Sequence, residues 1–202
     1  MACVSENPFE TPNVEAGAPT DHAGALPWFP VAPGKLTVMN VATFGLYSVY
    51  WFERQFRFQK QHFGRDSWPL ARALFSIFFV TGLARDVDIA AHDADLNVPW
   101  KATTTANTFI VISIASTLVN RLDPFGGGPI GTSIGLVVSL VLMGLAATPL
   151  ATLQTTINQL LARGYPHHTR NDRYSVLNIV WLVLVVLLVG FTIFFNLMVR
   201  PS

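Results

Sequence analysis

Residues 177–199, LNIVWLVLVVLLVGFTIFFNLMV, form an apolar block that contains no ionisable side chain. About 20 predominantly apolar residues are enough for a helix to cross the hydrocarbon core of a bilayer. The backbone in lipid must satisfy its own hydrogen bonds, so a block of this length is expected to be α-helical. The sequence therefore predicts an all-α integral membrane protein.

The overall composition agrees with this class. Charged residues make up 12% of the chain and hydrophobic residues 51%, whereas soluble proteins carry about 25% charged residues. The formal net charge is +1, so no basic excess indicates a nucleic-acid partner. Cys3 is the single cysteine, which excludes an intramolecular disulfide and a cysteine-based metal site. We expect no cofactor.

Four apolar blocks are long enough to be transmembrane helices: 36–52, 102–120, 130–150 and 177–199. A further helix around 69–95 is expected to be amphipathic or re-entrant. Its apolar core, Ala73 to Ala84, has 12 residues, and runs of about 10–14 residues are more often interfacial than spanning. The alternative is that this segment also crosses, which gives five transmembrane helices.

The distribution of basic residues favours four spans. Cytoplasmic loops are rich in Lys and Arg. With four spans, most Lys and Arg residues fall on one side of the membrane, whereas five spans divide them almost equally. The four-span arrangement places both termini outside. The expected location is a bacterial inner membrane, in which the protein is multi-pass.

The chain is expected to have two parts. Residues 1–34 contain six prolines and several acidic residues, and few aliphatic ones. Such a composition buries too little apolar surface to offset the entropy of ordering, which predicts a disordered tail. Residues 35–202 are expected to form a single helical membrane domain.

Aromatic and basic residues meet at the end of the first block. Trp and Tyr are enriched where the membrane meets water, and basic side chains lie in or beyond the headgroup layer. The expected interface anchors are Trp28, Tyr47, Tyr50, Trp51, Arg54, Arg57 and Lys60.

Small residues are candidates for helix packing. Gly131, Gly135 and Ser139 repeat at four-residue spacing, and Gly45 lies within the first block. Small side chains let membrane helices approach closely, and hydroxyl groups can bond across the gap. The block 102–120 is rich in Thr and Ser, which is expected to serve packing; a hydrophilic permeation path is the alternative.

The candidate metal ligands are Asp88, His92 and Asp95, with His167 or His168 from a later loop. At 100° per residue the first three share one helix face. An imidazole with two carboxylates can bind zinc or manganese. A solvated end of an amphipathic helix is the more common explanation of such residues, and no catalytic motif accompanies them.

The stretch FPVAPGKLTVMNVATFGLYSVYWFERQFRFQK, followed by WPLARALFSIFF, resembles a family of small bacterial multi-pass inner-membrane proteins of unknown function. The similar motifs are Phe-Pro-Val-x-Pro-x-Lys-Leu at Phe29–Leu36, Thr-Phe-Gly-Leu-Tyr-x-x-Tyr-Trp-Phe at Thr43–Phe52, and Arg-Ala-x-Phe at Arg72–Phe75. The resemblance implies a bacterial inner-membrane location and no particular activity.

The function expected from these features is that of a small non-enzymatic integral membrane protein. Its partners would be the lipid bilayer and either a second copy or a larger membrane complex, with no nucleic acid. A minor transporter or channel for a neutral or lipid-like solute is the first alternative. A metal-dependent membrane enzyme is the second.

Overall fold

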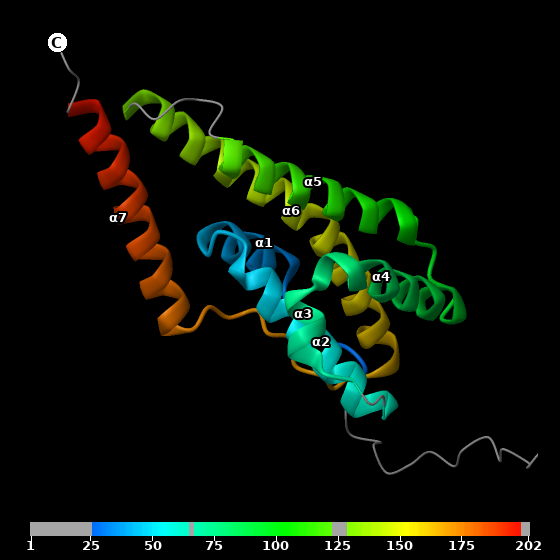
Figure 1. Ribbon diagram of the computed structural model, residues 1–202. Helices are drawn as coiled ribbons and strands as arrows, with labels where there is room; N and C mark the ends of the chain where they lie inside the picture. Colours follow the sequence, from blue (N-terminus) through cyan, green and yellow to red (C-terminus); the bar gives the residue numbers. More distant parts are fainter. Residues whose placement is uncertain (1–25, 65–66, 123–128, 199–202) are drawn as a thin grey trace, which may run out of the picture.

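The computed structural model describes residues 26–64, 67–122 and 129–198, and the regular elements in these parts are all α-helices (Figure 1). This confirms the all-α prediction. The helices are α1 (Pro33–Ala42), α2 (Leu46–Phe63), α3 (Pro69–Leu74), α4 (Ser76–Asp93), α5 (Ala102–Leu122), α6 (Pro129–Gly164) and α7 (Val176–Met198).

Three helices are long and apolar enough to cross a membrane. The qualifying segments are Ala102–Val119 in α5, Gly131–Gly164 in α6 and Val176–Asn196 in α7. They correspond to three of the four expected spans. With 36 residues, α6 is about 54 Å long at 1.5 Å per residue. This exceeds the ~30 Å hydrocarbon core, so α6 can cross a bilayer and still continue beyond it.

The expected span 36–52 is not one helix. The chain reverses at Thr43–Gly45, where Phe44 and Gly45 have φ angles of 50° and 88° in the left-handed region. The amide of Gly45 donates a hydrogen bond to the carbonyl oxygen of Asn40 at 2.8 Å and closes the turn. α1 has 10 residues and is therefore about 15 Å long, too short to cross a bilayer. The prediction of about four spans is not confirmed.

α1 and α2 instead form a helical hairpin that lies against α6. Near the start of α1, the Asn158 side-chain amide donates to the Val31 carbonyl oxygen at 2.9 Å. Near its end, the Asn40 amide donates to the Met143 carbonyl oxygen at 3.2 Å. α1 therefore runs antiparallel to α6, and α2 runs back in the opposite direction to α1. Both ends of this α1–α2 hairpin lie toward the same end of α6.

The expected helix around 69–95 is two helices that meet at Phe75. α3 ends at Leu74, and α4 begins at Ser76. α4 is not among the described helices that are apolar enough to cross a membrane, so the five-span alternative gains no support. One face of α4 is buried at helical spacing, through Val80, Leu83, Ala84, Val87 and Ala91, as expected for an amphipathic helix.

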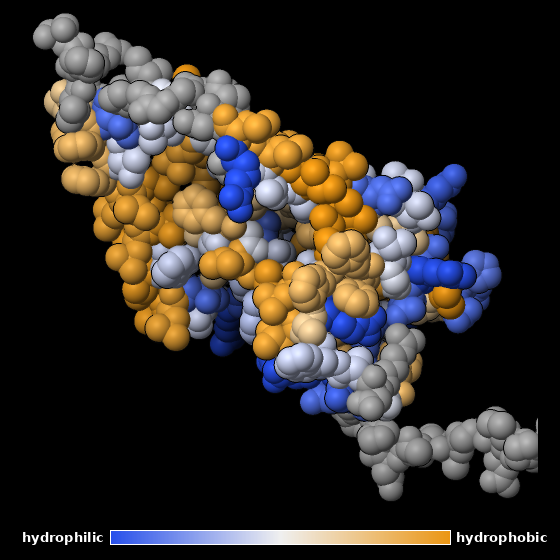
Figure 2. Space-filling view, viewed as in Figure 1, coloured by the Kyte–Doolittle hydropathy of each residue, from blue (hydrophilic) through white to orange (hydrophobic). Residues whose placement is uncertain are grey.

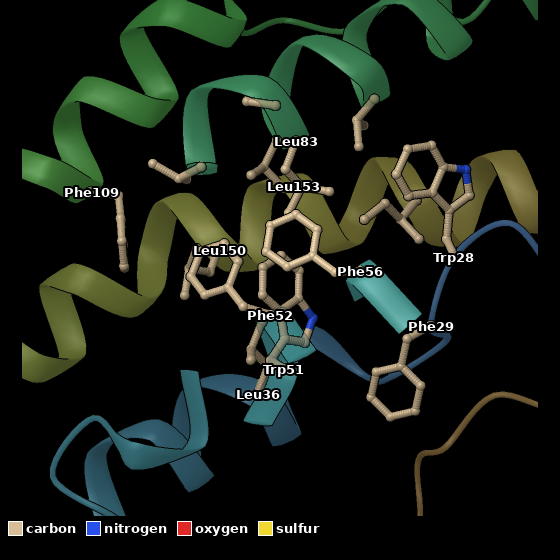
Figure 3. Packing of buried hydrophobic residues seen from close by; sticks show 14 of the residues in the cluster. Trp28, Phe29, Leu36, Trp51, Phe52, Phe56, Leu83, Phe109, Leu150 and Leu153 are labelled. Carbon is tan, nitrogen blue, oxygen red and sulfur yellow. The ribbon is translucent and has the colours of Figure 1, made fainter. Parts of the chain in front are cut away.

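The main core lies where α2, α4 and the second half of α6 meet (Figure 3). Trp51, Phe52 and Phe56 project from α2 toward Leu150 and Leu153 of α6. The rings of Phe52 and Phe56 stack with their centroids 6.1 Å apart. Such aromatic pairs contribute about 0.5–1.5 kcal/mol beyond the burial of their area.

Two of the expected interface anchors belong to this core. Trp28 and Trp51 are buried against other residues of the chain, which leaves their rings little surface to offer a membrane interface. Residues 27–31 are likewise buried, unlike the disordered tail expected there. Residues 1–25 of that tail, with Cys3, lie outside the described residues. An aromatic ring beside basic residues can therefore mark a core as well as an interface.

The surface divides into an apolar and a polar part. Figure 2 shows hydrophobic residues covering α7 and much of α5, and hydrophilic residues gathered around α2 and the end of α4. On α7, the large apolar side chains Val186, Leu187, Phe191 and Phe194 are exposed. A surface of this kind is suited to lipid or to other membrane helices.

Candidate functional site

The structure does not assemble the predicted metal site. His92 is exposed and Asp88 half-buried on α4, but α4 ends at Asp93, and Asp95 lies beyond it with a φ of 52°. His167 is exposed, and His168 Nδ1 is 2.7 Å from the carbonyl oxygen of Tyr165. Within residues 26–64, 67–122 and 129–198, no three His, Cys, Asp or Glu side chains lie close enough together to hold a metal ion.

Three hydroxyl groups of α5 bond to their own helix. Thr108 Oγ1 donates to the Thr104 carbonyl oxygen at 2.8 Å, and Ser116 Oγ donates to the Ile112 carbonyl oxygen at 2.8 Å. Thr117 Oγ1 bonds Ser113 in the same way at 2.9 Å. Such bonds use the hydroxyl hydrogens within the helix, and the transporter hypothesis stays a prediction.

The small residues of α6 are at least partly covered within one chain. Gly131 is buried, and Gly135 and Ser139 are half-buried. α5 and α6 lie side by side along this part of α6 (Figure 1). Gly45 approaches α6 as well, because a Cβ added to it would lie 3.1 Å from Met143 Sδ. Gly45 therefore lies at a close approach of two helices, as small residues in membrane proteins commonly do; a packing role for Gly131, Gly135 and Ser139 stays a prediction.

A buried polar network centres on Gln154. Its Oε1 accepts hydrogen bonds from Trp51 Nε1 at 2.6 Å and from Gln55 Nε2 at 3.0 Å. Its Nε2 donates to the Phe29 carbonyl oxygen at 3.1 Å and to Asn158 Oδ1 at 2.9 Å. A carboxamide has two donor hydrogens and two acceptor lone pairs, so the hydrogen-bonding capacity of Gln154 is filled.

This network holds the segment before α1 in place. Gln55 Oε1 accepts from the Phe29 amide at 3.0 Å, and Gln55 Nε2 donates to the Phe29 carbonyl oxygen at 3.2 Å. Together with the bond from Asn158 to Val31, these contacts fix the backbone of residues 29–31 between α2 and α6. Because the buried amides form their hydrogen bonds with backbone groups and with one another, we assign them a structural role.

A second polar site surrounds Lys35, whose exposed fraction is 5%. Its Nζ donates to Asn171 Oδ1 and to the Arg173 carbonyl oxygen, both at 2.7 Å. It also lies 5.8 Å from the centre of the Tyr174 ring. Lysine is rarely buried without a charged partner, and these contacts give it neutral oxygen atoms. The site therefore holds a largely uncompensated positive charge.

The pKa of Lys35 reflects its surroundings. Burial lowers the pKa of its ammonium group below the ordinary value of 10.5, and the charge of Asp172 offsets part of the effect. The Asp172 carboxylate is itself bound by Arg170 Nε at 2.6 and 2.7 Å. Because an acid already paired to arginine neutralises a second cation less completely, the net charge near Lys35 stays positive.

Lys35 lines a cavity of about 370 Å³ that opens where α7 begins. Hydroxyl, amide and guanidinium groups surround it. Its lining residues are Lys35, Met39, Tyr47, Tyr50, Asn171, Arg173, Ser175 and Asn178. We call it the Lys35 cavity. Tyr47 and Tyr50, expected as interface anchors, have ring centres 5.4 Å apart and form one wall.

An apolar groove of about 560 Å³ follows farther along α7, between α1, α6 and α7. We call it the α7 groove. Its lining residues are Thr37, Val38, Val41, Ala42, Leu140, Leu182, Val185, Val186, Val189 and Gly190. Thr37 Oγ1 donates to the Pro33 carbonyl oxygen at 3.1 Å, so the one polar side chain in this lining is satisfied within α1.

Sequence reasoning missed the residues that organise both sites. Gln154 and Asn158 lie among Leu150, Leu153 and Ile157 in the second half of α6. The available signal was therefore a polar amide at a position where the helical pattern predicts an apolar residue. Lys35 gave a weaker signal, because its partners lie 136 and 138 residues farther along the chain.

No protein-family model, curated protein or solved structure matches this chain. The resemblance of Phe29–Leu36 and Thr43–Phe52 to a bacterial membrane family therefore stays a prediction.

Proposed function

We propose that the protein is a small non-enzymatic integral membrane protein of a bacterial inner membrane, with a structural or interaction role. In this proposal α5, α6 and α7 cross the membrane, and the α1–α2 hairpin enters it and returns to the same side. The observation that carries the proposal is α7, an apolar helix whose side chains are mostly exposed. Such a helix is stable in lipid or against another membrane protein.

The basic residues support a definite orientation. The Arg54 guanidinium lies over the Phe29 ring with 5.5 Å to its centre, and Arg163 donates to the Ala94 carbonyl oxygen, which brings the ends of α4 and α6 together. Most described basic residues lie toward the side of the molecule where α5 begins, α6 ends and α7 begins. They are Lys35, Arg54, Arg57, Lys60, Arg72, Arg85, Lys101, Arg163, Arg170 and Arg173. Arg121, near the end of α5, is the exception. By the positive-inside rule the basic side is cytoplasmic.

Cysteine labelling tests this topology. In a Cys3→Ser background, single cysteines are placed at the exposed positions Gly34 and Lys60. Both are expected to resist a membrane-impermeant thiol reagent in intact cells and to react after the cells are opened, because the hairpin returns to its starting side. A cysteine at Arg121 should react in intact cells.

Labelling of Gly34→Cys and Lys60→Cys from opposite sides would contradict the hairpin and restore a crossing helix at 36–52. Labelling of both from outside would instead reverse the proposed orientation.

The interaction role rests on the two faces of α7. Trp181 Nε1 donates to the Ala42 carbonyl oxygen at 3.1 Å and fastens one face of α7 to the hairpin. The other face carries Leu187, whose exposed fraction is 63%, and its neighbours. We infer that this outer face is where a second copy or another membrane protein packs.

Photo-crosslinking tests this role. A photoreactive amino acid at Leu187, on the outer face, is expected to give a discrete protein adduct in native membranes. The same residue at Leu182, which lines the α7 groove, serves as the matched control and is expected to give far less of it. An adduct of twice the monomer mass identifies a second copy, and another discrete mass identifies a partner. Lipid adducts alone at Leu187 would refute the interaction role.

A further inference from the structure

We propose that the Lys35 cavity and the α7 groove together bind one anionic phospholipid, with its phosphate at Lys35 and one acyl chain between α1 and α7. This inference rests on the membrane placement proposed above, and it assigns a ligand to surfaces on the inner side of α7.

The Lys35 cavity has the chemistry of a phosphate site. An ammonium group has three N–H donors, and among the described residues the Lys35 ammonium has two hydrogen-bond acceptors. One donor is therefore left for a bound group. Arg173 and the phenols of Tyr47 and Tyr50 line the same cavity. Hydrogen bonds from charged donors to phosphate are about twice as strong as neutral ones.

The α7 groove has the chemistry of an acyl-chain site. α1 ends at Ala42, whereas α7 continues to Met198, so the hairpin covers α7 only along its first turns. The residues beyond Trp181 that line the groove are Leu182, Val185, Val186, Val189 and Gly190. A space with these walls excludes water, and a hydrocarbon chain fills it at no cost in unsatisfied polar groups.

The two surfaces follow one another along the same helix face. Asn178 lines the cavity and Leu182 lines the groove, one helical turn apart on α7. On α1, Lys35 and Val38 stand in the same relation. The polar end lies at the start of α7, on the basic side, and the apolar end lies farther into the proposed span. A phospholipid has the same order of charge and hydrocarbon.

Native mass spectrometry of the purified full-length protein in mild detergent tests this site. The probes are dioleoylphosphatidylglycerol and dioleoylphosphatidylcholine. We expect one retained molecule of the anionic lipid, with at least about a tenfold preference over the zwitterionic lipid. Lys35→Met should reduce this binding by about tenfold, the size expected for one charge-assisted hydrogen bond. Lys101→Met, which removes an exposed lysine at the same end of the molecule, should leave it unchanged.

A second variant tests the groove independently. Gly190 lines it, and a Cβ there would meet no atom within 4 Å. Gly190→Leu should therefore fold normally, occupy part of the groove and weaken binding of the anionic lipid several-fold. Glycerol 1-phosphate at millimolar concentration should not displace the lipid, because it lacks the acyl chain. If Lys35→Met fails to fold, Arg173→Gln at the exposed rim takes its place.

The proposal is overturned if the two lipids bind equally, or if Lys35→Met and Lys101→Met have the same effect. Displacement of the lipid by glycerol 1-phosphate would instead assign the cavity to a free phosphate compound. A dimer that Gly190→Leu dissociates would assign the groove to a second copy. These outcomes are separate from crosslinking at Leu187, which reports on the opposite face of α7.

Discussion

Replacement of Gln154 with leucine is expected to lower the free energy of unfolding by about 2–5 kcal/mol, because each buried polar group left without a partner costs about 1–3 kcal/mol. Leucine fits a similar space, but Trp51 Nε1 loses the oxygen to which it donates, and Asn158 Oδ1 loses the hydrogen bond that it accepts. The Phe29 carbonyl oxygen also loses one of the two side-chain amides that donate to it. The measurement is the shift of the unfolding midpoint in detergent, followed by tryptophan fluorescence.

Gln61→Leu provides the matched control. Gln61 is exposed on α2, and substitutions at such positions usually change stability by less than about 0.5 kcal/mol. A loss at Gln154 no larger than the loss at Gln61 would show that the network contributes little to the fold.

Gly45→Val is expected to cost about 2 kcal/mol or more, because a side chain in the left-handed region is strained and a β-branched one especially so. The new Cβ would also lie 3.1 Å from Met143 Sδ, so the Met143 side chain would have to shift by a few tenths of an ångström. Unfolding midpoints in detergent measure the loss.

Gly34→Val is the control for this substitution. Gly34 lies in the first turn of α1, where a Cβ meets no atom within 4 Å. Its replacement should change stability by no more than about 0.5 kcal/mol, as at most surface sites. Equal losses at Gly34 and Gly45 would mean that valine disfavours the helices generally and that the turn carries no particular strain.

The three long helices were predictable because a helix that crosses lipid requires a long run of apolar residues. An apolar run of sufficient length leaves a helix as the stable form, and 102–120, 130–150 and 177–199 are such runs. The continuation of α6 to Gly164 was missed because the sequence becomes amphipathic after Pro149. The buried residues there, such as Leu153 and Ile157, alternate with polar ones.

The misjudged span, 36–52, shows what a hydropathy run leaves out. The run has the composition of a spanning helix, but it contains Gly45 at a positive φ angle. Hydropathy does not distinguish a straight helix from two helices folded back on each other. Asn40, a polar residue in the middle of the run, was the available warning, since it bonds the backbone of α6 at Met143.

The candidate sites depended on long-range partners and were less predictable. Asp88, His92 and Asp95 share a face on an ideal helix, but α4 ends before Asp95. Gln154 is 125 residues from Phe29, and Lys35 is 136 residues from Asn171. The local sequence around Lys35 or Gln154 carries no trace of those neighbours.

The wide separation between Phe29 and Gln154 also bears on the order of events during synthesis. A ribosome adds about 5–20 residues per second, so about 6–25 s pass between the two residues. Throughout that interval the N-terminal hairpin lacks the amide that completes its hydrogen bonds. We expect it to remain loosely held until α6 is inserted, and a ribosome stalled before residue 154 should leave residues 29–31 open to protease.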